Sequence, residues 1–230
     1  MKIAIRGEGI TDIGTLNNGS LTKGAILLLI ERLECYQKLY NELGCTEEYN
    51  FIEWCYIHKD RIKKSTNARK QLVLRGKKKS RIEGTDNTFL KGFYKNSEAF
   101  AYLAKEQESD MAIFFVDSDN EAFEVRYKQV KEGLKKGSFD IRGVPMIPCK
   151  ISEVWLLCCF ENYINCSKLE ALTNDKNSSD YPKTLVEKSG KSHNEIAENC
   201  DSNRIDMPSF NRFREDFRMA VNDYLGCGIC

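Results

Sequence analysis

The sequence predicts an α/β fold in which a mostly parallel central sheet is flanked by helices, with a helical extension at the C-terminus. Two observations lead to this class. Short stretches rich in apolar, aromatic and β-branched residues alternate with longer stretches whose apolar residues recur at helical spacing. A strand followed by a helix, repeated along the chain, is typical of a parallel sheet whose connections are helices.

The first half of the chain supplies two of the expected strands. Residues 2–6 alternate and stop at a Gly-Glu-Gly turn, which predicts a strand and then a glycine-containing turn to about residue 20. Residues 21–43 carry apolar side chains at helical spacing and predict a helix that stops at Gly44. Residues 49–57, YNFIEWCYI, are aromatic and β-branched and predict the second strand.

The second half repeats the pattern. Residues 96–107 open with an Asn-Ser cap and predict a helix, and residues 111–116 predict a buried strand. An amphipathic helix is expected near 121–135. Residues 144–149 predict a short strand whose two prolines favour an edge or strand-end position. Residues 152–164 are apolar enough to form a buried helix.

The last third of the chain is less regular. Residues 165–204 are rich in Asn, Ser, Lys and Asp and predict a short helix between polar loops. Residues 208–226 predict an amphipathic helix, since three phenylalanines recur there at helical spacing. We therefore expect one α/β domain over residues 1–165, with the helical extension, residues 166–230, packed on it.

Composition suggests a soluble globular protein. Of the 230 residues, 41% are apolar and 30% charged, and no apolar run approaches the roughly 18 residues that span a bilayer. The start, MKIAIRGEG, reads as a strand and not as an export signal. We therefore expect a cytoplasmic protein that does not contact a membrane.

The ten cysteines argue against a disulfide framework. Four lie in apolar stretches, where reduced Cys behaves as a small buried hydrophobe: Cys55, Cys149, Cys158 and Cys159. Cys227 and Cys230 have CxxC spacing, but no second pair accompanies them, so a frayed terminus is favoured over a zinc site.

A strongly basic segment, residues 59–81, interrupts the domain. It holds eleven Lys or Arg against the single acid Asp60, although the formal net charge of the chain is only +1. Such a block suits the phosphate backbone of a nucleic acid, and its lack of aromatic residues favours phosphate over base contacts. A solvated loop is the alternative, and the two are compatible because a disordered basic arm can order on nucleic acid. The cations expected to bind nucleic acid are Lys63, Lys64, Arg69, Lys70, Arg75, Lys77, Lys78, Lys79 and Arg81.

Acidic side chains follow two of the expected strands. Asp117 and Asp119 come directly after the strand at 111–116, and Glu8 follows the strand at 2–6. In parallel sheets, ligands bind outside the carboxyl ends of the strands. If these two strands are neighbours, three carboxylates meet at one sheet edge, where they repel one another unless a cation or proton compensates them.

This arrangement predicts a Mg²⁺ site, with Mn²⁺ as a substitute, because Mg²⁺ often takes one or two carboxylates together with water and substrate phosphate. Asp117 and Asp119 would hold the ion, and Glu8 would be a second-metal ligand or a general acid or base. Asp12 would reach the same site if the turn after Glu8 winds into a helix. The simpler alternative is a buried strand that ends in polar residues.

Two motifs together resemble a known family. IRGEGITD, followed about a hundred residues later by FFVDSD, is similar to the signature of the Toprim domain. That domain is shared by topoisomerases, bacterial primases, and OLD-type and RNase-M5-type nucleases. The resemblance implies a compact, Rossmann-like α/β domain with a mostly parallel sheet. It also implies acid–base or metal chemistry for Glu8 and Mg²⁺ ligation by Asp117 and Asp119.

Two further segments, PMIPCKISEVWLL and PSFNRF, are similar to small uncharacterised bacterial Toprim-like proteins, some of which are encoded beside ATPases in phage-defence loci. By this resemblance Glu153 is another acidic residue near the site, and an ATPase from the same locus is a partner. A first-turn acid that stabilises a helix N-terminus is the alternative role for Glu153.

The sequence therefore predicts a Mg²⁺-dependent endonuclease that hydrolyses phosphodiester bonds of DNA or RNA, as an effector in anti-phage defence. One alternative is a nucleic-acid-binding or scaffold subunit of a defence complex without activity of its own. Another is a DxD phosphatase with Asp117 as the nucleophile. The choice between DNA and RNA, the sequence preference, and whether the chain forms a homo-oligomer stay open.

Overall fold

The first strand of the chain takes an inner position in the central sheet. The computed structural model describes residues 1–7, 9–17, 20–75 and 92–227. The sheet has the order β4-β1-β5-β6, and each neighbouring pair is parallel. Its strands are β1 (Lys2–Arg6), β4 (Glu53–Tyr56), β5 (Met111–Phe115) and β6 (Gly143–Met146). The expected parallel sheet is confirmed, and β6 lies at one edge, as its prolines predicted.

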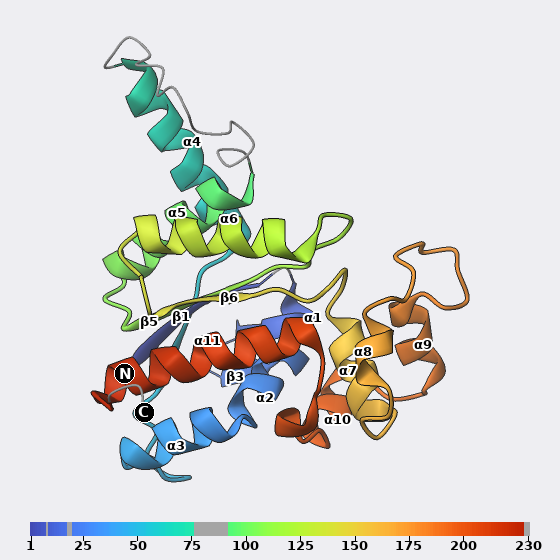
Figure 1. The fold of residues 1–230 in the computed structure, drawn as a ribbon. Coiled ribbons are helices and arrows are strands. Elements are labelled where there is room, and N and C mark those ends of the chain that lie inside the picture. Colours follow the sequence, from blue (N-terminus) through green and yellow to red (C-terminus); the bar gives the residue numbers. More distant parts are fainter. Residues whose placement is uncertain (8, 18–19, 76–91, 228–230) are drawn as a thin grey trace.

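Helices cover both faces of this sheet (Figure 1). One face carries α5 (Phe93–Glu106) and α6 (Phe123–Lys136). The other carries α2 (Ala25–Glu31), α3 (Glu34–Glu42) and the long C-terminal helix α11 (Pro208–Leu225). This confirms an α/β fold of Rossmann-like type. None of the described helices is both long and apolar enough to cross a membrane.

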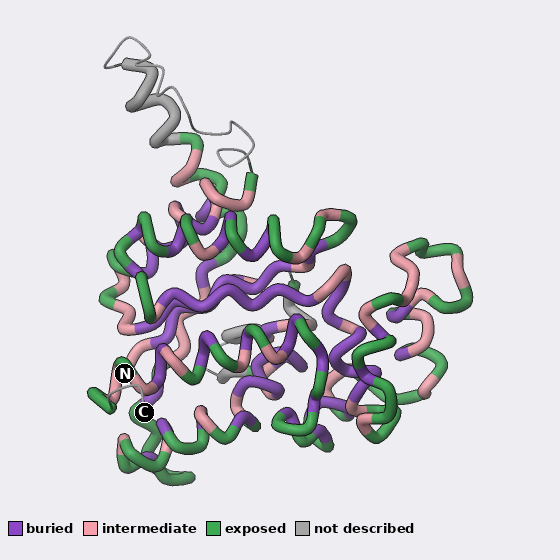
Figure 2. Tube along the Cα trace, in the orientation of Figure 1, coloured by how far each residue is buried: buried purple, intermediate pink, exposed green. Residues whose placement is uncertain are grey.

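Both faces of β5 are buried, which explains its uninterrupted apolar sequence. Met111, Ile113 and Phe115 belong to the core beneath α2, α3 and α11, whereas Ala112 and Phe114 belong to the core beneath α5 and α6. Successive side chains of a strand point to opposite faces, so a strand covered on both sides needs apolar residues throughout. The buried trace through the middle of Figure 2 follows these strands.

The segment after β1 differs from the prediction. It holds a short helix, α1 (Ile10–Ile13), and an antiparallel hairpin of β2 (Gly14–Asn17) and β3 (Ser20–Lys23). The expectation of one helix over 21–43 is therefore wrong. Its first residues belong to β3, and the remainder is divided into α2 and α3.

Two close packing contacts account for this difference. A Cβ on Gly24 would lie only 2.5 Å from the carbonyl carbon of Asp12, so the connection from β3 to α2 needs a residue without a side chain. Leu33 has an extended backbone, with φ −69° and ψ 138°, and is fully buried. At the same break, Nε2 of Gln37 donates a hydrogen bond to the carbonyl oxygen of Glu31. Leu33 is thus buried in a non-helical conformation, and the apolar spacing of the sequence continues through the break.

The helix after the basic segment also starts earlier than expected. α5 begins at Phe93, so the predicted cap at Asn96 and Ser97 is wrong. Ser97 lies inside the helix, fully buried, and its Oγ donates a hydrogen bond to the carbonyl oxygen of Phe93 at 2.8 Å. A serine that bonds back to the preceding turn can sit within a helix, which the sequence pattern does not distinguish from a cap.

The basic segment begins as a helix. α4 (Lys59–Arg75) is separated from β4 by only two residues and projects from the body beside α5 (Figure 1). Ile62, which is 2% exposed, anchors the base of α4 in the core beneath α5 and α6. Four of the cations predicted to bind nucleic acid lie outside the described residues: Lys77, Lys78, Lys79 and Arg81.

The C-terminal part contains more helix than expected. The chain forms α7 (Glu153–Phe160), α8 (Cys166–Leu169), α9 (Pro182–Lys188), α10 (His193–Glu198) and the 3₁₀ turn η2 (Ser202–Arg204) before α11. Local signals account for two of these short helices: Pro182 stands at the start of α9, and Ser192 and Glu195 form a capping box at α10. The prediction for residues 208–226 is confirmed, because Phe210, Phe213 and Phe217 of α11 are all buried.

Two disulfides correct the expectation of reduced cysteines. Cys158 is bonded to Cys166, and Cys159 to Cys200. They tie the end of α7 to α8 and to the residues after α10. The prediction failed because each bond joins residues that only the tertiary fold brings together. Cys149 and Cys55 remain free, as expected.

Candidate functional site

The carboxyl ends of β1 and β5 lie side by side. Arg6, the last residue of β1, is in register with Phe114 of β5, so the residues that follow the two strands emerge at the same sheet edge. The condition for a shared acidic edge, that these two strands are neighbours, is thus met. Glu8 lies outside the described residues, so the expectation that it meets Asp117 and Asp119 stays a prediction.

The loop after β5 is anchored by its central serine. Ser118 is buried, Asp117 is half-buried and Asp119 is exposed. The backbone N–H of Ser118 donates to the carbonyl oxygen of Pro148 at 3.2 Å, and that of Asp119 donates to the carbonyl oxygen of Lys150 at 3.0 Å. In return, the backbone N–H of Lys150 donates to Oγ of Ser118 at 2.7 Å. The two carboxylates therefore flank a serine that is locked to the loop after β6.

The backbone of this junction is held in an uncommon conformation. Asp119 has φ 52° and Lys150 has φ 66°, both in the left-handed region that non-glycine residues rarely adopt. Such conformations persist where surrounding contacts impose them, and they concentrate at functional sites. Here the paired loops supply those contacts. The loop after β5 is therefore a turn whose backbone is fixed by hydrogen bonds to the loop after β6.

Two buried arginines support the same sheet edge. Arg126 of α6 is 5% exposed; its Nη2 donates to the carbonyl oxygen of Ser118 at 3.1 Å, and its Nε pairs with Glu121 at 3.1 Å. Arg6 is 8% exposed, and its Nη1 donates to the carbonyl oxygen of Phe115 at 2.5 Å. Sequence reasoning missed both residues, because an arginine in an amphipathic helix or at a strand end normally faces solvent. Their positive charge lies beneath a loop that carries two carboxylates.

Glu153 joins the aspartates in the electrostatic environment of one tyrosine. Glu153 is the first residue of α7, and Tyr181 directly precedes α9, which packs against α7. Burial raises the pKa of the Tyr181 phenol, and the negative charges of Glu153, Asp117 and Asp119 raise it further. Three of the predicted site residues therefore contribute to the negative potential at one phenol. Sequence reasoning missed Tyr181, which lies in a polar loop without periodicity.

The donor chemistry of this edge suits Mg²⁺. Asp117 and Asp119 offer carboxylate oxygens only, and Mg²⁺ commonly takes one or two carboxylates and completes its shell with water and phosphate oxygen. Within the part of the chain that the structure describes, no three or more His, Cys, Asp or Glu side chains are grouped closely enough to hold a metal by themselves. A Mg²⁺ ion at this edge would therefore depend on water, substrate or Glu8 for its remaining ligands.

The structure also shows where Asp12 and Lys150 lie. The turn after Glu8 does wind into a helix, α1, and Asp12 lies on it, half-buried. The ammonium of Lys150 donates hydrogen bonds to the carbonyl oxygens of Ala171, at 3.1 Å, and Leu172. Lys150 thus links the loop after β6 to Ala171 and Leu172.

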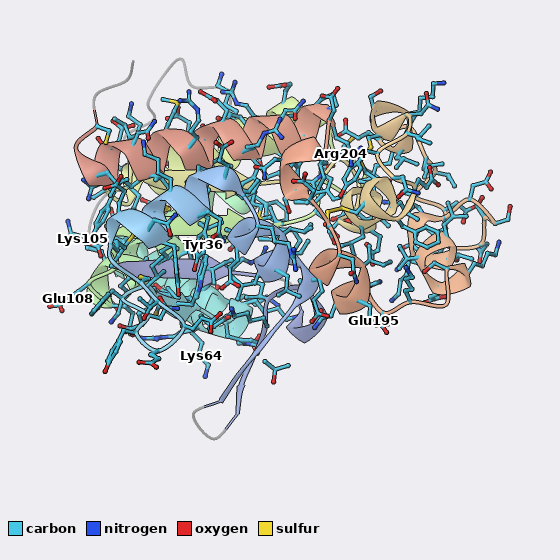
Figure 3. All side chains as sticks on the ribbon, turned by 90° about the horizontal axis from the view of Figure 1, so that it is seen from below. Tyr36, Lys64, Lys105, Glu108, Glu195 and Arg204 are labelled. Atoms are coloured by element: carbon cyan, nitrogen blue, oxygen red, sulfur yellow. A yellow bond between two sulfur atoms is a disulfide. The ribbon has the colours of Figure 1, made fainter. Side chains whose placement is uncertain are left out.

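Basic residues leave the sheet at the same edge as the acids. Because β4 is parallel to β1, α4 begins at the carboxyl edge of the sheet, where Asp117 and Asp119 also lie. Lys63 and Lys64 on the first turns of α4 are exposed (Lys64 is labelled in Figure 3). Three further predicted cations belong to the outer part of the same helix: Arg69, Lys70 and Arg75.

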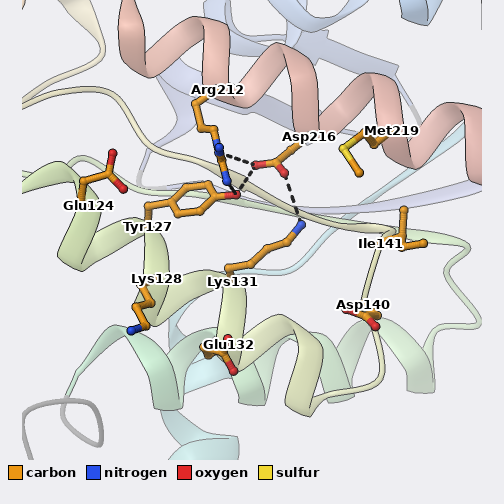
Figure 4. Close-up of a pocket in the computed structure, with 10 residues that line it drawn as sticks. All are labelled: Glu124, Tyr127, Lys128, Lys131, Glu132, Asp140, Ile141, Arg212, Asp216 and Met219. Atoms are coloured by element: carbon orange, nitrogen blue, oxygen red, sulfur yellow. Dashed lines mark hydrogen bonds and ion pairs between the residues drawn. The ribbon is translucent and has the colours of Figure 1, made fainter. Parts of the chain in front are cut away.

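A second polar cluster lies between α6 and α11 (Figure 4). Asp216 is among the residues that line a groove of about 550 Å³. The hydroxyl of Tyr127 donates to Oδ2 of Asp216 at 2.8 Å, Lys131 pairs with Oδ1 at 3.4 Å, and Arg212 donates to the Tyr127 hydroxyl at 2.9 Å. These polar groups satisfy one another, so the cluster joins two helices and does not present groups to a ligand.

Comparison of the chain with family models, curated proteins and solved structures produced no match. The Toprim resemblance therefore rests on the short motifs around Glu8, Asp117 and Glu153.

Proposed function

We propose that the chain is a Mg²⁺-dependent nuclease that hydrolyses phosphodiester bonds of DNA or RNA at the carboxyl edge of its sheet. The observation that carries the proposal is the fixed turn that holds Asp117 and Asp119 beside the end of β1 and is bonded to the loop that leads into Glu153. Three acids from two loops at a ligand-binding edge suit chemistry on a phosphate group.

Each acidic residue has a distinct part in this proposal. Asp117 and Asp119 hold the ion, and Asp12 is a further candidate ligand. When bound, Mg²⁺ would neutralise charge that develops on the phosphate and lower the pKa of a bound water. Glu8 takes a proton from the attacking water or gives one to the departing alcohol as the phosphorus–oxygen ester bond breaks. Glu153 orients water at the edge of the site.

In this proposal the basic helix α4 binds the phosphate backbone of the substrate. A nucleic acid carries a negative charge on each phosphate, and Lys or Arg side chains that neutralise these charges contribute sequence-independent affinity. α4 starts at the edge that carries the acids and projects outward, so it would extend along a bound nucleic acid from the site (Figure 1). Its cations also offset repulsion between the phosphates and the carboxylates.

A nucleic-acid-binding subunit without activity is the second candidate. It is favoured by the lack of a self-sufficient metal cluster within the described ranges, which omit Glu8. A DxD phosphatase would use the same Asp117 as a nucleophile. Activity separates the three: a nuclease cleaves plasmid or tRNA, a phosphatase releases phosphate from a monoester, and a scaffold does neither.

The decisive experiment combines metal binding with cleavage. Mn²⁺ affinity is measured by calorimetry, and plasmid and tRNA cleavage are measured with Mg²⁺. For Asp119→Asn we expect at least 10-fold weaker Mn²⁺ binding, unchanged or slightly higher thermal stability, and loss of cleavage, because one of two like charges is removed. For Glu8→Gln we expect retained Mn²⁺ binding with cleavage lowered roughly 100-fold or more.

The matched control is Asp140→Asn. Asp140 is an exposed acid at the other end of β6, paired with Lys135 at 3.7 Å. It should leave metal binding and cleavage unchanged. If Asp119→Asn binds Mn²⁺ with wild-type affinity, the DSD segment is not a metal site and only ends a strand. If the wild-type protein binds metal but cleaves no substrate, the scaffold is favoured.

We extend the proposal to a role in anti-phage defence together with a partner ATPase, as the motif resemblance implies. A plaque assay tests this role. Cells that carry the wild-type locus should resist phage, and cells that carry Asp119→Asn should not, at equal protein levels. Equal resistance in both strains would show that resistance to phage does not depend on the acidic site.

A further inference from the structure

We infer that the outer edge of β4 is a self-association surface, at which a second copy of this chain pairs its own β4 in antiparallel register about a two-fold axis at Cys55. The inference goes beyond the proposed function, because the pairing needs neither a metal nor a nucleic acid. It joins the sheets of two copies into one continuous sheet.

The backbone of β4 is bonded on one side only. In the order β4-β1-β5-β6 it is an edge strand, and β1 is its neighbour. The N–H groups of Glu53 and Ile57 donate to carbonyl oxygens on the β1 side, at 2.9 Å and 3.0 Å. Alternate residues of a strand turn their N–H and C=O to the same side, so Trp54 and Tyr56 direct theirs outward. Within the described part of the chain, no backbone or side-chain group is bonded to these outward groups.

The open edge has defined ends. Before it, the N–H of Ile52 donates to Oδ1 of Asn50 at 2.8 Å. After it, the carbonyl oxygen of His58 accepts the N–H of Arg61 at 3.0 Å, where α4 begins. The outward groups that another strand can reach are therefore those of Trp54 and Tyr56.

This edge is complementary to itself. In an antiparallel pair, two residues that face each other with outward groups exchange both of their N–H···O bonds. Trp54 of one copy opposite Tyr56 of the second forms two such bonds, and the symmetry-related pair forms two more. The register places Cys55 opposite its own copy, at a position between the bonded pairs. A two-fold axis through Cys55 thus satisfies every outward group of both edges.

The charges beside the edge favour the antiparallel orientation. Antiparallel pairing places the chain before β4 of one copy next to the chain after β4 of the other. The described residues on the two sides differ in sign and are exposed: Glu47, Glu48 and Glu53 before or at the start of β4, and Lys59 and Arg61 after it. Opposite charges therefore meet at both ends of the paired strands, whereas parallel pairing would bring like charges together.

Two large aromatic side chains stand exposed on the loop that enters β4. Tyr49 is 65% exposed and Phe51 is 56% exposed. In the antiparallel register Phe51 faces Lys59 of the second copy, so the second copy would cover this loop. Aromatic residues are enriched in interfaces between proteins, because they bury a large area. They add apolar contact to the main-chain bonds.

The opposite edge of the sheet is protected from such pairing. On β6, Pro145 has no N–H to donate, and Nζ of Lys131 donates to the carbonyl oxygen of Gly143 at 2.9 Å. α11 also packs against β6. Proline and covering helices are common means of blocking a sheet edge, and β4 has neither a proline nor a bond from a side chain to its outward groups among the described residues. Self-association is therefore directed to β4.

A cross-link tests the register. Facing residues of a pair without mutual bonds have Cα atoms about 4.5 Å apart, which a disulfide can span. Diamide joins two thiols into a disulfide and takes up the two electrons and two protons itself. In the background Cys227→Ser/Cys230→Ser, brief treatment should give a linked dimer on a non-reducing gel. Adding Cys55→Ser should lower its yield at least 10-fold, and adding Cys35→Ser, at another half-buried free cysteine, should not.

Sedimentation velocity over a range of concentrations measures the association itself. We expect a reversible dimer for wild type. Cys55→Lys sets two ammonium groups opposite each other and should raise the dimer Kd roughly 5-fold or more. Cys55→Val keeps a neutral side chain of strand-forming type and should leave Kd within about threefold of wild type. Thermal melting of both variants excludes loss of fold as the cause.

A charge exchange tests the orientation. Glu53→Lys should weaken the dimer, and the double variant Glu53→Lys/Lys59→Glu should recover most of the loss, because opposite charges meet again across the axis. Glu42→Lys, at an exposed acid of α3, makes the same change of charge and should leave Kd unchanged.

Three results would overturn the inference. A monomer at every concentration up to roughly 100 µM would leave this edge to a strand of a different protein, if to any partner. A dimer with wild-type Kd in Cys55→Lys would associate through another surface. A linked dimer that forms equally well without Cys55 would have a different register. Metal binding and cleavage by the acidic edge are measured separately, so each of these results leaves the nuclease proposal intact.

Discussion

The backbone N–H of Lys150 donates a hydrogen bond to Oγ of Ser118 at 2.7 Å, and this bond joins the loops that follow β5 and β6. Ser118 is only 1% exposed, although acids stand on both sides of it. The DSD segment is therefore a buried serine with two carboxylates projecting from a fixed turn. Its geometry depends on a residue that no metal or substrate needs to touch.

Ser118→Ala should consequently weaken both the fold and the site. The variant leaves the part-buried N–H of Lys150 without its acceptor, which costs about 1 kcal/mol of unfolding free energy. We also expect weaker Mn²⁺ binding, because the turn loses an anchor. Urea unfolding and calorimetry measure the two effects. Ser179→Ala, at an exposed serine bonded to Asp180, is the control, and an equal loss of stability in both variants would contradict the anchoring role.

The double variant Lys63→Gln/Lys64→Gln tests the basic helix. It should lower affinity for DNA and RNA of all sequences alike, and it should reduce the slope of log K against log salt by roughly 1 to 2. Electrophoretic or fluorescence binding at several salt concentrations provides the measurement. Lys135→Gln/Lys136→Gln at the exposed end of α6 removes equal charge and should have a smaller effect. Unchanged affinity with altered sequence preference would argue for base contacts instead.

Asp216→Ala should be among the more destabilising substitutions in α11. Asp216 is 7% exposed and bonded to Tyr127 and Lys131, so its removal takes the acceptor from the Tyr127 hydroxyl and the anionic partner from Lys131. We expect a loss of about 3 kcal/mol in urea unfolding. Asp223→Ala on the same helix breaks an ion pair with Arg142 in which both side chains are 37% exposed, and it should cost less than about 1 kcal/mol. Similar losses of unfolding free energy in Asp216→Ala and Asp223→Ala would show that the buried cluster stabilises the fold no more than the exposed ion pair does.

Tyr127 predicts a loss of stability in alkali. Burial, and then the hydrogen bond to Asp216, raise the pKa of Tyr127 from 10.0 to about 12. The native state therefore holds this proton more tightly than the unfolded state. The contribution to stability is complete below about pH 10 and is lost as the pH rises to about 12. Unfolding free energy measured across this range should fall less steeply in Tyr127→Phe than in wild type, whereas the exposed-site variant Tyr49→Phe should follow wild type.

The disulfides predict sensitivity to reductants. Opening Cys159–Cys200, which closes a loop of 41 residues, should lower the unfolding free energy by about 3 to 4 kcal/mol. A dithiol reductant should therefore lower the melting temperature of wild type, and Cys159→Ser/Cys200→Ser should melt lower without reductant. Cys227→Ser, at an exposed free cysteine, should not. If thiol titration of the native protein counts all ten cysteines as free, these bonds do not form in solution.

Local patterns accounted for those parts of the fold in which burial follows the chain. The apolar run of β5 predicted a strand covered on both faces, and the spacing of Phe210, Phe213 and Phe217 predicted the long terminal helix. Both predictions succeeded because the burial pattern is visible in the order of apolar residues. A strand buried on both faces is apolar at every position, and a helix buried on one face is apolar at every third or fourth position. The same rule failed at Leu33, where an apolar residue at helical spacing is buried in an extended conformation.

By itself the sequence determined the parallel α/β class, the strands that end in acids, and the placement of Asp117 and Asp119 after a buried strand. Only the tertiary structure decided the strand order that sets β1 beside β5, the link from Ser118 to Lys150, and the packing of α9 against α7. The two disulfides belong to the same group. The physical reason is that periodicity records which face of an element is buried, whereas contacts between loops depend on how separate elements pack, and polar loops carry no periodic signal of their partners.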